Sequence, residues 1–477
     1  MSLPIQDILS TLSSLGEEIV SLKQSISEQR MEISGLYRRL ESKDREILEL
    51  RHANSELRER LSRYEHPGKD SHNSNQPPSQ ENLASQAIRR TQSLREKSTR
   101  NSGGQPGHEG FTLQQVSVPD STEHHIPEFC QHCGTSLSDV SSQLLGVRQI
   151  IDLPAINPVV SEHRIYGKQC QCGYFTKDVF PKEARSHVCY GPNIRSLISY
   201  LNVVQCIPYE RICEVLRECF HVDLSQGTVN NVLASMQQSS NEMYEQIRSR
   251  ITQSQVVGAD ETGAYVAGKL EWVWGFQTDK LTYLYHDASR GKAAIDKHFS
   301  KGLPHSTLVT DRFTPYFNCQ VKAHQICLAH LLRELTYLSE LNKNQDWSTR
   351  LMELLREAIH NRKSMKWENI PRTILFERLD RLLNECTDKL HENFGRLHRS
   401  LLKHRNNIFR FLSNPNIPYD NNASERAIRL VKIKYKVSGC FRSPEGADIF
   451  TQLLSMADTA KKNGMSRFQA LCLIAQY

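Results

Sequence analysis

The sequence has no long apolar segment. Nothing in its 477 residues approaches the roughly 20 consecutive apolar residues that a membrane-spanning helix needs. The first residues, MSLPIQDILSTL, also lack the basic stretch and uninterrupted apolar core of a secretory signal. Apolar residues make up only 38% of the chain, which is little for one compact globule. We therefore expect a soluble, cytoplasmic protein with no membrane partner, built from about two to four folded units.

The sequence also lacks the dense cysteine pattern of a small disulfide scaffold, since its 13 cysteines are widely dispersed. Two close pairs stand out: Cys130 and Cys133 in CQHCG, and Cys170 and Cys172 in KQCQCG. Four thiolates on two turns are typical of a tetrahedral structural Zn²⁺ site, which predicts a zinc-finger-like module over residues 111–188. The short Cys-x-Cys spacing strains this geometry or leaves one ligand position to His132 or Cys189. Free thiols without a metal are the alternative.

Charge of one sign does not dominate, since the formal net charge is only +7. It has the sign that a nucleic-acid partner favours. Residues 66–110 are rich in Ser, Asn, Gln, Pro and Gly, which predicts a flexible linker. Its basic residues are Arg89, Arg90, Arg95, Lys97 and Arg100. Arg89 and Arg90 are candidates for DNA contact through counterion release, and a solvated spacer without a ligand is the alternative.

The first 65 residues carry a heptad pattern of apolar positions. The seam consists of Ile5, Ile8, Leu12, Leu15, Ile19, Leu22, Ile26, Ile33, Leu36, Leu40, Ile47, Leu50, Leu57 and Leu61. Only Gln29, Lys43 and Asn54 interrupt it. A seam of this length predicts a coiled coil that joins copies of the chain into a homo-oligomer. An amphipathic helix packed on its own protein is the alternative, but it usually has a wider apolar stripe.

Residues 189–250 show helical spacing of apolar residues. Ser225 is a candidate N-cap for a helix that carries Thr228, Asn230 and Asn231. The outline resembles a helix-turn-helix whose second helix enters the DNA major groove. Plain helical scaffolding explains the pattern equally well, because the second helix starts without Arg or Lys.

Three acids stand in distinctive settings: Asp260 in QVVGADETGAYV, Asp311 in STLVTDRFTPYF, and Glu425 in YDNNASERAIRLVK. An apolar run leads directly into each aspartate, which predicts two buried strands that end at an active-site edge. Glu425 falls in the first turn of a predicted helix. Carboxylate oxygens of this kind suit Mg²⁺ or Mn²⁺, and two such ions support phosphoryl transfer. For each acid taken alone, a cap, a turn residue or a surface charge is the more common role.

The remaining residues of the region 251–477 surround these acids. Strand-like segments follow Asp260, the segment GKAAIDKHF predicts a helix, and residues of about 327–415 predict a helical insertion. Its expected helices are 328–341, 349–362 and 372–410. Glu261 should point to the strand face opposite Asp260. The basic residues after Glu425 either hold DNA phosphates or form a charged outer helix face, and they are Arg426, Arg429, Lys432, Lys434 and Lys436.

Seven motifs in order resemble the transposase of the insertion sequence 66 family: DSHNSNQPPS, GGQPGHEG, the cysteine pairs, YGPNIRSLISYL, ADETG, CLAHLLREL and NNASERAIR. The resemblance implies a bacterial DDE transposase in which Asp260, Asp311 and Glu425 form the metal-binding triad of a ribonuclease-H-like domain. In that family the second cysteine pair is usually Cys-x-x-Cys. Cys327 and His330 resemble the Cys-x-x-His pair that follows the second acid in several transposase families. Their role stays open.

The expected fold is multidomain α/β, with a coiled coil, a zinc module, a helix-turn-helix-like region and the ribonuclease-H-like domain. The expected function is binding of element ends and target DNA, with metal-dependent cleavage and strand transfer. Helper proteins of the same element are possible partners. Two alternatives are a catalytically decayed DNA-binding or assembly protein and a structure-specific nuclease without joining activity.

Overall fold

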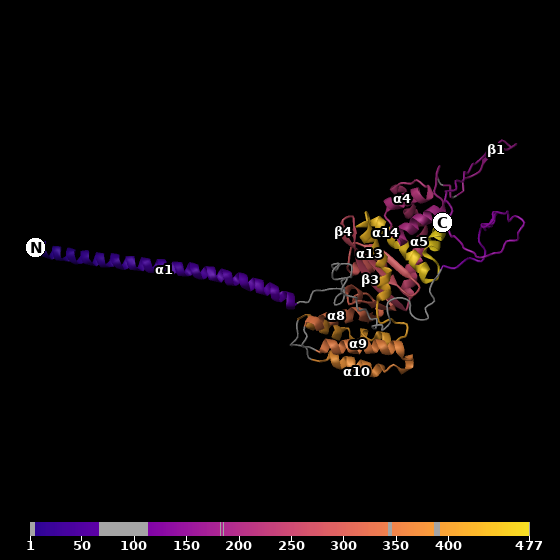
Figure 1. Ribbon diagram of the computed structural model, residues 1–477. Coiled ribbons are helices and arrows are strands. Elements are labelled where there is room, and N and C mark those ends of the chain that lie inside the picture. The colour runs from indigo at the N-terminus through magenta and orange to yellow at the C-terminus, as the bar shows by residue number, and fades with distance from the viewer. Residues whose placement is uncertain are drawn as a thin grey trace. The chain divides into compact units, whose positions relative to one another are not determined.

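A computed structural model describes residues 5–65, 113–181, 183–184, 186–341, 346–385 and 392–476 (Figure 1). The chain divides into two compact units. The first contains Met1–Thr91, Arg333–Glu353 and Thr387–Gly395, and the second contains Gln92–Leu332, Leu354–Cys386 and Arg396–Tyr477. The predicted basic linker, with Arg89 and Arg90, lies outside the described residues. A search of the described helices finds none with the length and apolar character that crossing a membrane requires.

The first unit begins with α1, one uninterrupted helix from Ile5 to Glu65. The prediction of a long helix here is confirmed. Many seam residues are exposed along its described surface, namely Ile19, Leu22, Ile26, Ile33, Leu36, Leu40, Ile47 and Leu50. Their apolar side chains are therefore available for a second helix, and the coiled coil itself stays a prediction.

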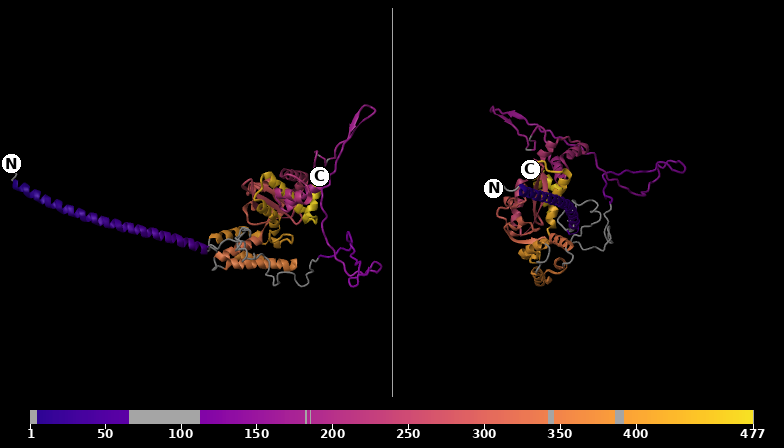
Figure 2. Two further views of the ribbon diagram at one scale, coloured as in Figure 1. Left: turned by 45° about the horizontal axis from the view of Figure 1, so that its top comes forward. Right: turned by 90° about the vertical axis from the view of Figure 1, so that its left-hand side faces the viewer.

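The described part of the second unit begins at residue 113, and up to residue 190 it carries few regular elements (Figure 2). Its short antiparallel strands are β1 (Gly167–Gln169) and β2 (Phe175–Lys177), and both are exposed. The two cysteine pairs lie on separate turns, as predicted. The Cys130 carbonyl accepts from Gly134 N at 2.9 Å, and the Cys170 carbonyl accepts from Gly173 N at 2.9 Å.

A five-stranded sheet forms the centre of the second unit, in the order β5, β4, β3, β6, β7. The strands are β3 (Val256–Val266), β4 (Lys269–Gln277), β5 (Thr282–Asp287), β6 (Leu303–Thr310) and β7 (Val321–Ile326). The first three form an antiparallel meander, whereas β6 and β7 run parallel to β3. Ala267 and Gly268 join β3 to β4 with positive φ angles, as a two-residue hairpin requires. The crossover to β6 contains the predicted helix, α6 (Lys292–His298), and α7 (Thr314–Phe317) precedes β7.

Helices bury both faces of this sheet. One face packs against α5 (Gln226–Gln253), α13 (Arg429–Ser438) and α14 (Pro444–Lys462). Other helices pack on these and share the same apolar cluster: α3 (Pro192–Ser199), η2 (Tyr200–Val204), α4 (Tyr209–Phe220) and α15 (Arg467–Ala475). The other face holds an aromatic cluster with Trp274, Phe276, Tyr283 and Tyr285, covered by α6 and the end of α5. The edge strand β5 is capped by α14, because Ser455 Oγ accepts from Leu284 N at 2.8 Å.

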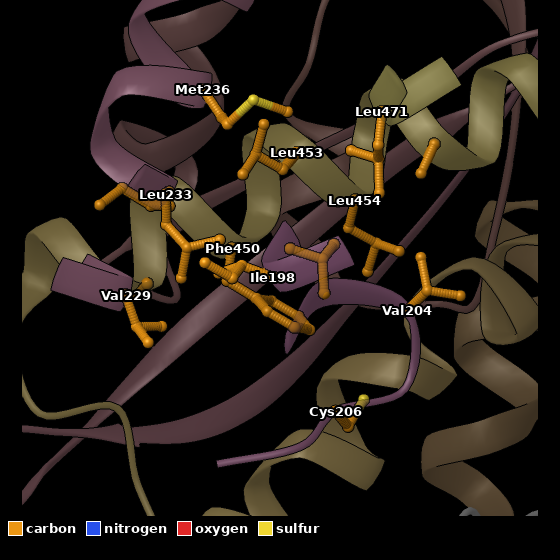
Figure 3. Packing of buried hydrophobic residues seen from close by; sticks show 14 of the residues in the cluster. Ile198, Val204, Cys206, Val229, Leu233, Met236, Phe450, Leu453, Leu454 and Leu471 are labelled. Atoms are coloured by element: carbon orange, nitrogen blue, oxygen red, sulfur yellow. The ribbon is translucent and has the colours of Figure 1, made fainter. Parts of the chain in front are cut away.

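The helical region 189–250 and the sheet share one apolar core. Figure 3 shows Ile198, Val229 and Leu233 packed with Phe450 and Leu453 of α14. The predicted boundary at residue 250 falls inside α5, so it does not coincide with a gap in this core. Ser225 caps α5 as predicted, accepting from Thr228 N at 3.2 Å.

The helical insertion follows β7. Its helices α8 (Leu328–Leu341) and α9 (Trp347–Ser364) match the prediction. One helix over 372–410 was expected, and this is wrong. The helix α10 (Arg372–Leu383) ends at Leu383, and its C-cap, Asn384, donates its N–H to the carbonyls of Asp380 and Arg381. The separate helix α11 (Glu392–Lys403) follows, and the short 3₁₀ turns are η3 (Trp367–Asn369), η4 (Arg405–Asn407) and η5 (Arg410–Leu412).

Candidate active site

The sheet brings Asp260 and Asp311 together. β3 pairs with β6 up to Gly258 and Val309, and the two aspartates stand two residues further along their chains. Asp311 directly follows β6, as predicted. The expectation that Asp260 ends its strand is wrong, because β3 continues to Val266 through its hairpin with β4. Asp260 instead lies just beyond the last pair between β3 and β6, where β3 continues paired only with β4.

Glu425 lies in the first turn of α12 (Asn422–Ala427), as predicted. Two glycines allow this helix to approach the sheet closely. A Cβ on Gly258 would lie 2.5 Å from Ser424 Oγ, and a Cβ on Gly275 would lie 2.9 Å from Cγ2 of Ile428. Gly275 is also the Cα partner of Asp260 on β4. The absence of these side chains therefore places Glu425 beside the strand that carries Asp260.

Mutual repulsion between carboxylates marks this site. Burial raises the pKa of Asp260 well above its ordinary value, and the charges of Glu261, Asp311 and Glu425 raise it further. Lys432 acts in the opposite direction. The pKa of Asp311 rises to about 6, mainly through burial and then through Glu261. A divalent cation among these oxygens would relieve both the burial and the repulsion.

Glu261 lies on the other face of β3, as the strand pleat predicts. Its side chain is only 3% exposed and pairs with Arg290 Nη2 at 2.9 Å. The Tyr316 hydroxyl donates to its Oε2 at 2.5 Å. Arg290 in turn lies over the rings of Trp272 and Phe313, at 4.3 and 4.5 Å from their centres. Glu261 is thus held by structural contacts, although its charge reaches both aspartates.

Cys327 and His330 both contact the segment around Glu425. His330 Nε2 lies 3.5 Å from Glu425 Oε1. Cys327 N donates to the Thr310 carbonyl at 2.7 Å, and its sulfur accepts from Asn421 N at 3.1 Å. Burial raises the pKa of the Cys327 thiol to about 12. Cys327 therefore joins the strand before Asp311, through its backbone N–H, to the loop before Glu425, through its neutral thiol.

The basic residues after Glu425 divide into two groups. Arg426, Arg429 and Lys432 are exposed, and Lys432 lies near enough to Asp260 to oppose the rise in its pKa. Lys434 is instead 7% exposed, and burial lowers its pKa to about 8. Its Nζ donates to the Ile207 carbonyl at 3.3 Å. Lys434 is therefore removed from the candidate DNA contacts.

Asn421 also belongs to this site. In the sequence it is one of several polar residues before a predicted helix, and in the structure its position is the N-cap of α12. Its side chain makes no capping hydrogen bond and instead donates to the Ala259 carbonyl at 2.7 Å. A pair of asparagines is an ordinary helix-start signal, so the pattern contained no indication of this contact.

The residues present fit the predicted metals in chemistry. Asp260, Asp311 and Glu425 offer carboxylate oxygens, which Mg²⁺ and Mn²⁺ prefer. In the thiol turns, hydrogen bonds with Thr135 and Cys130 lower the pKa of Cys133 to about 7, and contacts with Cys172 lower that of Cys170. Among the described residues, however, no three or more His, Cys, Asp or Glu side chains already surround a common point. Both metal sites stay predictions.

Comparison with known proteins assigns the family. The family model "Transposase IS66 family" matches residues 187–449, which cover more than half of the chain and include all three acids. The chain belongs to the IS66 transposase family. A second model, a family of unknown function called DUF6444, matches residues 19–114. No curated protein matches the chain.

Proposed function

We propose that this chain is a DNA transposase that cuts the ends of its element and joins them to target DNA. The observation that carries the proposal is the placement of Asp260, Asp311 and Glu425 around the end of the β3–β6 pairing, near enough for Asp311 and Glu425 to raise the pKa of Asp260, within a domain of the IS66 family. The strand order β5, β4, β3, β6, β7, with only the meander antiparallel, supports a ribonuclease-H-like fold for this domain. Family membership supports the transposase role.

The chemistry follows from the residues of the site. Asp260, Asp311 and Glu425 would hold two divalent ions, which activate the attacking oxygen and stabilise the leaving oxygen in phosphoryl transfer. In cleavage, water attacks the scissile phosphate and a 3′-hydroxyl leaves. In joining, that 3′-hydroxyl attacks a target phosphodiester and displaces another 3′-oxygen. The number of phosphodiester bonds is conserved in the second step, so it needs no external energy source.

The protein surface near the acids would position the DNA. Arg426, Arg429 and Lys432 extend from α12 and α13 into solvent, next to Glu425 in the sequence. Contacts of Arg and Lys with phosphates supply sequence-independent affinity and fix the register of a duplex. We assign these three residues to the backbone near the scissile bond. Specific recognition of element ends belongs elsewhere, and α4 with α5 offers exposed Asn230 and Asn231 for it.

The test is cleavage and strand transfer on a labelled duplex of the element end, with Mg²⁺, Mn²⁺ or EDTA. The parent should give metal-dependent nicks and joined products, and Asp260→Asn and Glu425→Gln should give neither while still binding the duplex. Asp296→Asn is the matched control, because the Asp296 side chain is 44% exposed and pairs only with Lys292 among the described ion pairs. Nicks without joined product would favour the nuclease, and binding without chemistry in the parent would favour the decayed DNA-binding protein.

A further inference from the structure

We infer that Asn421 sets the three acids in place relative to one another, as a positioning residue that does not touch the substrate. The inference rests on the proposed function, because it assigns a role within the same site. Asn421 is 1% exposed and lies between the insertion and α12. Each of its hydrogen-bonding groups leads to a peptide next to one of the acids.

The first link reaches Asp260. The side-chain amide of Asn421 donates to the carbonyl of Ala259 at 2.7 Å. Ala259 immediately precedes Asp260 in the middle of β3. Residues on adjacent positions of a strand share one rigid backbone, so this bond fixes the height of α12 over Asp260.

The second link reaches Asp311 through one intermediate residue. Asn421 N donates to the sulfur of Cys327 at 3.1 Å, and Cys327 N donates to the Thr310 carbonyl at 2.7 Å. Thr310 is the last residue of β6 and directly precedes Asp311. The Cys327 thiol stays neutral because burial raises its pKa, so it can accept the N–H without adding charge near the acids.

The third link reaches Glu425 itself. The Asn421 carbonyl accepts from Glu425 N at 3.2 Å and from Ser424 N at 3.0 Å. Asn421 Oδ1 also accepts from the Ser424 hydroxyl at 2.5 Å. Ser424 then accepts from Gln277 Nε2 at 3.3 Å, and Lys462 Nζ donates to Gln277 Oε1 at 2.9 Å. The network therefore connects α12 to β4 and α14 as well.

Gly258 leaves the space that this hydrogen-bond network needs beside β3. Gly258 precedes Ala259, and a Cβ there would lie 2.5 Å from Ser424 Oγ, 2.6 Å from Gln277 Nε2 and 2.9 Å from Asn421 Oδ1. Glycine thus leaves the space that three polar side chains occupy against the strand. At position 421 the network needs a donor and an acceptor on one short side chain, which asparagine supplies and aspartate or leucine does not.

The test compares Asn421→Ala with the matched control Asn422→Ala. Asn422 is the neighbouring asparagine, and its side chain bonds Asp420 Oδ2 at 2.8 Å. Mn²⁺ binding to the full chain is measured from the free Mn²⁺ signal in electron paramagnetic resonance, with Asp260→Asn as the background. The Mn²⁺ dependence of duplex cleavage and thermal unfolding are measured on the same samples.

Asn421→Ala should raise the Mn²⁺ concentration for half-saturation about tenfold or more, as loss of a residue that orients ligands does. Saturating Mn²⁺ should recover most of the cleavage rate, which a general loss of folding would not allow. Asn422→Ala should match the parent. If Asn421→Ala does not fold, Ser424→Ala removes only the hydroxyl links and should raise the half-saturating concentration by a smaller factor.

Two results overturn the inference in distinguishable ways. A parent that binds Mn²⁺ at the acids, with a folded Asn421→Ala or Ser424→Ala that binds it equally well, removes the positioning role alone. A parent with no more Mn²⁺ binding than Asp260→Asn removes the proposed metal site, and the positioning role with it.

Discussion

His330 Nε2 lies 3.5 Å from Oε1 of Glu425, although most of the helical insertion separates them in the sequence. His330 belongs to the first turn of α8, and Glu425 belongs to the first turn of α12. The two ends of the insertion also meet through Leu328 N, which donates to the Tyr419 carbonyl at 2.9 Å. The first and last residues of the insertion thus lie side by side, and the insertion places His330 next to Glu425.

We predict that His330→Ala lowers the cleavage rate about tenfold or more, because Glu425 loses a neighbour that orients its carboxylate. His330→Gln should lose less, since its amide keeps a polar group near Glu425. The rate is measured on the element-end duplex at fixed Mn²⁺. His305→Ala is the control, because His305 is exposed on β6. Equal rates for His330→Ala and the parent would contradict the assignment.

We predict that the seam of α1 joins copies of the chain. Leu22→Asp with Ile33→Asp should reduce the mass measured by light scattering, because a charge in a coiled-coil seam opposes helix pairing. The matched control is Val20→Asp with Met31→Asp. Val20 and Met31 are exposed apolar residues of the same helix outside the seam. Removal of residues 1–65 should also reduce the number of chains per particle. An unchanged number of chains would rule out this contact.

We predict about one Zn²⁺ per chain, bound by Cys130, Cys133, Cys170 and Cys172. Cys133→Ser should lower the zinc content measured by elemental analysis of the purified protein. Cys189→Ser tests the alternative ligand. Cys219→Ser is the control, because Cys219 is exposed on α4 and far from both turns in sequence. If protein purified from zinc-supplemented cultures contains no zinc, these thiols do not bind the metal.

We predict that His298 makes the fold sensitive to acid. Burial, followed by Lys297 and Arg248, lowers its pKa to about 4 from an ordinary value of 6.5. Its ring stacks on Tyr285 at 3.7 Å, and Nδ1 bonds the Tyr283 hydroxyl at 2.8 Å. Because the folded-state pKa is depressed, the stability from neutral His298 is present above pH 6.5 and is lost as pH falls toward 4.

Between pH 7 and pH 4.5, the unfolding free energy of His298→Gln should therefore fall by less than that of the parent. The difference should be on the order of 1 to 2 kcal/mol. The variant is expected to be less stable at pH 7, since it loses the ring contact. Chemical denaturation at both pH values measures the difference, with His305→Gln as the exposed control. Parallel pH dependence in His298→Gln and the parent would show that another group controls acid sensitivity.

The sequence was sufficient to predict the local settings of Asp311 and Glu425, the long first helix and most strands, because each depends on local spacing. Asp311 at a strand end and Glu425 in a first turn are examples. The position of Asp260 within β3 was missed, since the hairpin partner that extends the strand lies outside the local pattern. The network around Asn421 could not be predicted, because its partners come from distant segments: Ala259, Gln277, Cys327, Ser424 and Lys462.

The core shared by the helical region and the sheet also bears on how this protein can be altered. Ile198 and Leu233 come from the helices before the sheet, whereas Phe450 and Leu471 come from those after it. A graft of α3 to α5 from a relative would therefore supply only part of this apolar core, without the side chains of α14 and α15 that pack against it. A donor segment that contains α3 to α5 must therefore also include α14 and α15, because their side chains share one core.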